Sequence, residues 1–113
     1  MSRFEQENAT AVRLAIEDEI EERNVKLKQM DKEEKEKKRA LARSYVSTEI
    51  KKQLMDSYYE KKVVEESVDD FCEKQKEYEE GLQNYKEQKL ILKEELSALE
   101  YWLSTKQTKT VNM

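Results

Sequence analysis

Residues 64–103 read VEESVDDFCEKQKEYEEGLQNYKEQKLILKEELSALEYWL, and their spacing decides the fold. Positions that step alternately by four and three residues form a seam. These positions are Val64, Val68, Phe71, Gln75, Tyr78, Leu82, Tyr85, Lys89, Leu92, Leu96, Leu99 and Leu103. All but Gln75 and Lys89 are apolar or aromatic. A 3.5-residue period keeps one side of a helix facing a neighbour, so the seam predicts a left-handed coiled coil.

The seam has two halves of different chemistry. Its leucine half consists of Leu92, Leu96, Leu99 and Leu103. Its aromatic half contains Phe71, Tyr78 and Tyr85. Rings crowd a two-stranded core, and a buried Tyr hydroxyl needs a polar partner. We therefore expect the aromatic half to pack against a heterologous surface, with a homodimer that leaves the hydroxyls in water as the alternative.

We expect the apolar seam to be buried mainly against other chains. The expected partner-binding residues are Val64, Val68, Phe71, Tyr78, Leu82, Tyr85, Leu92, Leu96, Leu99 and Leu103. The pattern fits either one continuous helix or a helical hairpin.

The rest of the chain divides into three further segments. Residues 1–30 predict an N-terminal helix that opens with a capping box, Ser2 with Glu5. Residues 31–62 predict an exposed, charged helical strut, with breaks expected near 44–48 or 56–57, where residues that can cap helices gather. A second apolar stripe starts there with Val46, Ile50, Leu54 and Tyr58. Residues 63–103 are the heptad helix, and residues 104–113 lose the pattern and predict an extended tail.

Composition agrees with long helices. Charged residues make up 42% of the 113 residues and hydrophobic residues 36%, with a single Gly and no Pro. Compact folds need more apolar side chains and more turn formers. Basic and acidic residues number 22 and 26, and this balance, together with the periodicity, opposes disorder. We expect an all-α chain, a coiled-coil rod of long helices and not a compact globule.

The residues required for most catalytic and metal chemistry are scarce. The chain has no His, one Cys and one Gly, which excludes a Cys–His nucleophile pair, a zinc site and a glycine-rich phosphate loop. We expect no enzyme activity, no cofactor and no metal. Interleaved acids and a sequence pI near 5.1 argue against nucleic acid, and no apolar run is long enough to span a membrane. The lone Cys72 favours a reducing, intracellular location.

The stretch from Phe71 to Leu82, FCEKQKEYEEGL, resembles a segment of small helical microtubule inner proteins of cilia and flagella. Those proteins carry an aromatic residue or Leu, an acidic run, and then Tyr and Leu four residues apart. Gly81 departs from the pattern, which has an acidic residue before the Leu. The resemblance implies a non-catalytic protein of the axonemal cytoskeleton that binds tubulin and neighbouring helical proteins along doublet microtubules. A subunit of a soluble tether, motor or adaptor complex and a self-contained homodimer are the alternatives.

Overall fold

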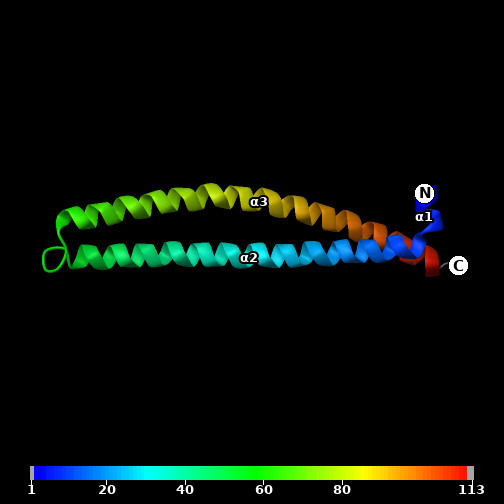
Figure 1. Cartoon of the computed structure of the whole chain (residues 1–113), viewed down its shortest axis with the longest axis horizontal. Coiled ribbons are helices and arrows are strands. Elements are labelled where there is room, and N and C mark those ends of the chain that lie inside the picture. The colour runs from blue at the N-terminus through cyan, green and yellow to red at the C-terminus, as the bar shows by residue number, and fades with distance from the viewer. Residues whose placement is uncertain (1, 112–113) are drawn as a thin grey trace. The chain divides into compact units, whose positions relative to one another are not determined.

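The computed structural model describes the backbone of residues 2–111 and the side chains of residues 2–106. The described chain contains three helices, α1 (Arg3–Glu7), α2 (Ala9–Gln53) and α3 (Lys61–Val111), and no strand. Figure 1 shows these helices in order along the chain. The prediction of an all-α chain of long helices is confirmed.

The helices pair as a hairpin, and the chain divides into two compact units. Unit 1 contains Met1–Gln29 and Glu87–Met113, and unit 2 contains Met30–Lys86. Within each unit, segments of α2 and α3 lie side by side and run in opposite directions (Figure 1). Unit 1 therefore holds the leucine half of the seam, and unit 2 holds the aromatic half.

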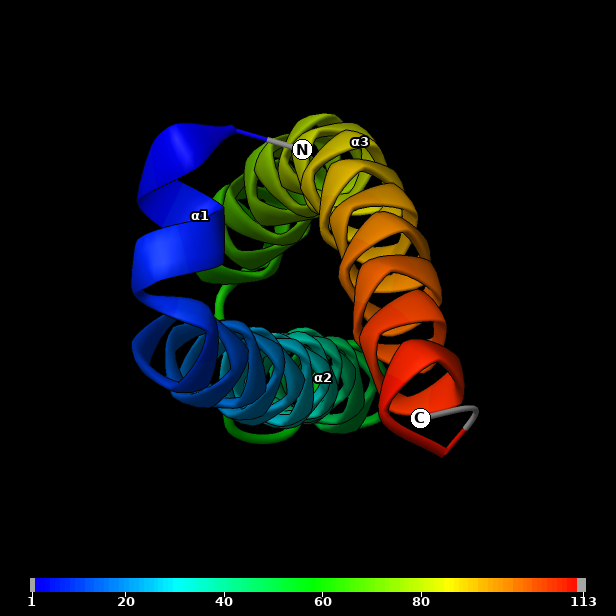
Figure 2. The same ribbon diagram turned by 90° about the vertical axis from the view of Figure 1, so that its right-hand side faces the viewer.

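The N-terminal helix starts as predicted but is shorter than expected. The Ser2 hydroxyl accepts a hydrogen bond of 3.2 Å from the Glu5 backbone N–H, which is the first contact of a capping box. Asn8 ends α1 after only five residues, because its backbone leaves the helical conformation, with φ −126° and ψ 34°. Its backbone N–H and its side-chain amide both donate to the Phe4 carbonyl and cap the end of the helix. Figure 2 shows α1 turned away from the axis of α2.

The connection between α2 and α3 occupies residues 54–60. The Leu54 carbonyl accepts backbone hydrogen bonds from Ser57, Tyr58 and Tyr59 at 3.1, 2.9 and 3.2 Å. The break expected at residues 56–57 is present, whereas the alternative at 44–48 is wrong because these residues lie inside α2. Thr48, which can cap a helix, instead bonds across the hairpin to Ser67 at 2.9 Å.

The extended tail is also a wrong prediction as far as Val111, since α3 continues to that residue. No Gly or Pro interrupts residues 104–111. The Thr105 hydroxyl donates to the Trp102 carbonyl at 2.7 Å, so a hydroxyl that could have competed with the helix bonds back to it instead. Residues 112–113 of the expected tail lie outside the described residues.

Candidate protein-binding surfaces

The seam of α3 is the most covered face of that helix. Val64, Leu92 and Leu96 are buried, with 5, 8 and 8% of their surface exposed. The other predicted partner-binding residues are half-buried; they are Val68, Phe71, Tyr78, Leu82, Tyr85, Leu99 and Leu103. Lys89 is half-buried as well, and Gln75 is exposed. The 4-3 spacing therefore identified the inward face of α3.

The first neighbour of this seam is the chain's own α2. Phe71 lies 5.5 Å from Tyr45 between ring centroids, with the planes tilted by 56°. Tyr85 bonds to two side chains of α2. The expectation that the seam is buried mainly against other chains therefore needs correction, because hairpin formation already covers much of it. The predicted partner-binding residues hold the hairpin together, and a partner has to use other faces or the uncovered parts of these residues.

In unit 1 the core is apolar and is flanked by an ion pair. Ile16 of α2, with 2% exposed, and Leu92 and Leu96 of α3 are its buried apolar side chains. Arg23 donates from Nε to a carboxylate oxygen of Glu95 at 2.8 Å and also pairs with Glu19 on its own helix. Hydrogen bonds to Glu19 and then to Glu95 raise the pKa of Arg23. The ion pair between Arg23 and Glu95 therefore joins α2 to α3 at this position.

In unit 2 the aromatic half is held by a polar cluster. The Tyr85 hydroxyl donates to a Glu33 carboxylate oxygen at 2.9 Å and accepts from Lys37 Nζ at 3.1 Å. The same ammonium lies 4.7 Å from the Tyr85 ring centroid. The hydrogen bond to Tyr85 is the main reason why the pKa of Lys37 is raised, and the charge of Glu33 adds a smaller effect in the same direction. The Tyr85 hydroxyl thus has the polar partners that we expected, but within this chain.

This cluster also corrects the expectation of an exposed strut. Most side chains of residues 31–39 are exposed, yet Glu33 and Glu34 are half-buried. Sequence reasoning missed Glu33 and Lys37 because their cross-helix partner, Tyr85, is about fifty positions further along the chain. In the sequence, the only indication of this cluster is that one predicted helix is rich in charged residues and the other is rich in Tyr.

Near the turn, α2 turns its polar side inward. Thr48 is buried, with 3% exposed, and bonds to Ser67. Val46 and Ile50 lie on the opposite side of α2 and are 54% and 48% exposed. Leu54 and Tyr58, the other members of the stripe predicted from spacing, lie in the connection after α2 and are exposed as well. Val46 and Ile50 face outward because Ser44 and Thr48 occupy the inward positions of the heptad pattern in this part of α2.

Open grooves flank the aromatic half of the seam. One of about 350 Å³ is lined by Lys37, Ala40, Leu41, Lys74, Glu77 and Tyr78. A smaller hollow of about 40 Å³ reaches Gly81, Leu82 and Tyr85. A Cβ atom added to Gly81 would have no neighbour within 4 Å. Packing within the chain therefore does not require a glycine at this position.

At the free ends of the helices, α1 is clasped to α3. The indole N–H of Trp102 donates to a Glu5 carboxylate oxygen at 3.1 Å, and Lys106 pairs with the same oxygen. The Lys106 ammonium lies 5.8 Å from the Trp102 ring centroid. The hydrogen bond from Lys106 is the main reason why the pKa of Glu5 is lowered. We call Glu5, Trp102 and Lys106 the clasp.

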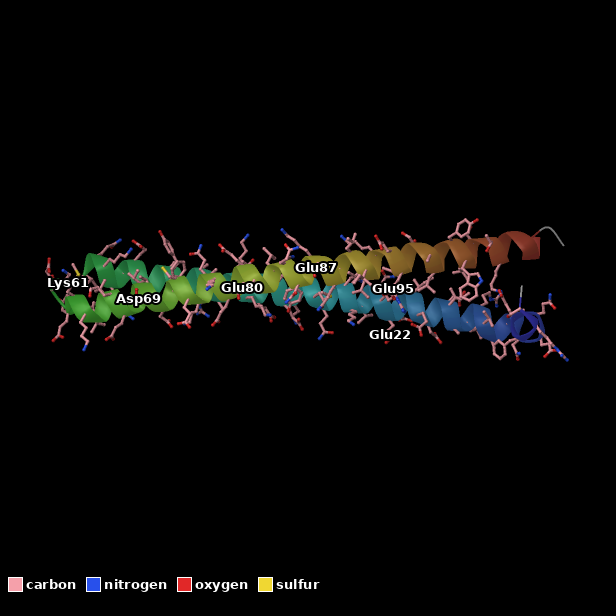
Figure 3. All side chains as sticks on the ribbon, turned by 90° about the horizontal axis from the view of Figure 1, so that it is seen from above. Glu22, Lys61, Asp69, Glu80, Glu87 and Glu95 are labelled. Carbon is pink, nitrogen blue, oxygen red and sulfur yellow. The ribbon has the colours of Figure 1, made fainter. Side chains whose placement is uncertain are left out.

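Several large apolar side chains lie outside these contacts. Side chains project outward along both helices (Figure 3). On α3, Leu90, Ile91 and Tyr101 are 58, 56 and 74% exposed. We call these three residues the outer face of α3; they belong to unit 1.

None of the described side chains forms a cluster of three or more His, Cys, Asp or Glu residues that could hold a metal ion. Among the described residues, no helix is both long and apolar enough to cross a lipid bilayer. No family model matches this chain, and neither a curated protein nor a solved structure is significantly similar to it.

Proposed function

We propose that this chain is a non-catalytic structural protein that joins a larger protein assembly through the outer face of α3. One observation carries the proposal: the C-terminal part of α3 is apolar on opposite sides. Leu92 and Leu96 are buried in the hairpin, while Leu90 and Ile91 beside them are more than half exposed. A helix that is apolar all round is normally buried all round.

The exposed area is large enough to contribute to binding. Tyr101, Leu90 and Ile91 are a ring and two aliphatic side chains, types that contribute about 1.5–3 kcal/mol each when fully buried. Aromatic residues such as Tyr101 are also enriched among the side chains that dominate interfaces. Hairpin formation leaves these side chains in water, so a partner protein gains by covering them.

We further propose that the assembly is a filament, with the axonemal doublet microtubule as the candidate. The support is the resemblance between residues 71 and 82 and a segment of microtubule inner proteins. In this segment Phe71, Tyr78 and Leu82 are half-buried in the hairpin, while the intervening Glu73, Glu79 and Glu80 are exposed. The acidic side chains are accordingly the part of the segment most available to a neighbour.

The test of binding uses substitutions that leave the seam intact. The double variant Ile91→Asp with Tyr101→Asp should bind the native assembly more weakly, by at least about tenfold for each substitution. Each substitution removes apolar contact and introduces a charge. The matched control is Lys93→Asp, an exposed position elsewhere on the same turns. Circular dichroism should show unchanged helix content in all variants. Normal recovery of the double variant with the assembly would refute the outer face as the binding site.

The test of location is separate. A tagged chain expressed in ciliated cells should remain with the doublet microtubules after detergent removes the membrane. A chain that is absent from axonemes but still isolated in a stable complex would refute the filament and support the tether or adaptor alternative.

A further inference from the structure

The side of α2 that faces away from the hairpin core carries two stripes with the same spacing. The acidic stripe, in unit 1, consists of Ala11, Leu14, Asp18, Glu21 and Val25. The basic stripe, in unit 2, consists of Lys32, Lys35, Arg39, Ala42 and Val46. Both step by three, four, three and four residues, and all ten side chains are exposed. Each stripe therefore lies along one face of its helical segment.

We propose that the acidic stripe of one copy docks antiparallel on the basic stripe of a second copy. This arrangement sets Glu21 opposite Lys35 and Asp18 opposite Arg39 of the other copy. It also sets Leu14 opposite Ala42, and Ala11 opposite Val46. Read in reverse, the basic stripe steps by four where the acidic stripe steps by three, so the five pairs match to within one residue, and the fifth pair sets Val25 opposite Lys32.

Charge complementarity identifies the occupant as a second copy. The charged positions of the acidic stripe are all negative, and those of the basic stripe are all positive. A parallel, in-register pairing of two α2 helices would place like charges opposite each other, which is unfavourable. Antiparallel docking of unlike stripes brings opposite charges together instead.

The apolar members of the stripes argue against a purely solvated face. Leu14, Val25 and Val46 are 50, 58 and 54% exposed. A helix face that only contacts solvent does not need Leu or Val at the same three-four spacing as its charged residues. An interface does, since apolar contact supplies affinity while the charges select partner and register.

The inference goes beyond the proposed function, because it uses α2 and leaves the outer face of α3 free for other proteins. Each copy offers one stripe of each kind. A copy whose acidic stripe is docked therefore still offers its basic stripe to the acidic stripe of another copy.

Light scattering on the full-length chain at rising concentration tests the contact. The wild-type chain should exceed its monomer mass of 13.6 kDa in a concentration-dependent way. The double variant Lys35→Glu with Arg39→Glu should weaken association at least about tenfold, as should Asp18→Lys with Glu21→Lys. The control, Lys76→Glu with Lys86→Glu, changes the net charge as Lys35→Glu with Arg39→Glu does, but at exposed positions of α3, and it should associate like the wild type. Circular dichroism verifies that each variant is helical.

Mixing the two stripe variants gives the decisive result. Each variant alone has two stripes of the same sign, but in the mixture every acidic stripe finds a basic one. We expect each variant alone to associate at least about tenfold more weakly than the wild type, and the mixture to associate as the wild type does. A wild-type chain that stays monomeric at all concentrations, or a mixture that does not recover association, would overturn the inference and leave the outer face of α3 untouched.

Covalent capture provides a second measurement. In a Cys72→Ser background and with an added thiol oxidant that accepts two electrons per disulfide, a chain with Leu14→Cys mixed with a chain with Ala42→Cys should form a mixed disulfide faster than the same Leu14→Cys chain with Ser97→Cys on α3. Equal rates would contradict the antiparallel register.

Discussion

Unit 1 and unit 2 use the same two helices but pack them with different chemistry. In unit 1, the buried side chains are apolar: Ile16 of α2 and Leu92 and Leu96 of α3. In unit 2, the rings of Tyr45 and Phe71 contact each other, and Tyr85 bonds to a carboxylate and lines a small hollow. The difference shows that one unbroken heptad pattern can produce an apolar contact in one stretch and a more polar contact in the next, because the occupants of the seam decide which side chains of the other helix they meet.

The largest predicted effect contrasts the two halves directly. Leu96→Asp should lower the free energy of unfolding by about 4 kcal/mol, because it removes a buried side chain and buries a charge in an apolar core. Leu82→Asp should cost about half as much, about 2 kcal/mol, since Leu82 lines a hollow shared with Lys37. Urea unfolding followed by circular dichroism measures both. Equal losses would show that the two units pack alike.

The second prediction tests the packing of unit 2 at Gly81. Gly81→Ala should stabilise the isolated chain by about 1 kcal/mol, because Ala is the better helix former and its Cβ meets nothing within 4 Å. Thermal unfolding measures the change. If the same variant binds its assembly less well, a partner approaches the backbone at Gly81; if the isolated chain is destabilised, the hollow at this position is closed.

The smallest effect concerns the clasp of unit 1. The lowered pKa of Glu5 means that its carboxylate adds stability above its ordinary pKa, and that this stability is lost as the pH falls through the lowered pKa. Trp102 is the only Trp, so its fluorescence should report release of the clasp in an acid transition. Glu5→Gln should abolish this transition, while Glu100→Gln should leave it in place. A transition that survives Glu5→Gln would assign the titration to another carboxylate.

The sequence predicts α3 far better than α2. Along α3 apolar residues fill nearly every inward position, so counting steps was sufficient. Along α2 several inward positions are polar, among them Arg23, Lys37 and Thr48. Each of these side chains has a hydrogen-bond partner on α3 that is remote in sequence, and no local sequence pattern predicts such a pair.

The same physics explains the misleading stripe and the wrong tail. Val46 and Ile50 share a face by spacing, but spacing does not say whether a face meets the hairpin core or solvent. Thr48 looked like a helix break because its hydroxyl can cap a helix, yet that hydroxyl bonds to Ser67. The hydroxyl of Thr105 similarly bonds within α3 and allows the helix to continue.

The hairpin turn has a consequence for the order of folding. The Thr48–Ser67 bond in unit 2 joins residues 19 positions apart, whereas the Trp102–Glu5 bond in unit 1 joins residues 97 apart. Closing the longer loop first costs about 1.4 kcal/mol more in chain entropy. Unit 2 is therefore expected to form first, starting at residues 54–60, and the leucine core of unit 1 to form after it. The aromatic half of the seam would then serve as the starting point of folding, and the clasp would be the last contact to form and the first to fray.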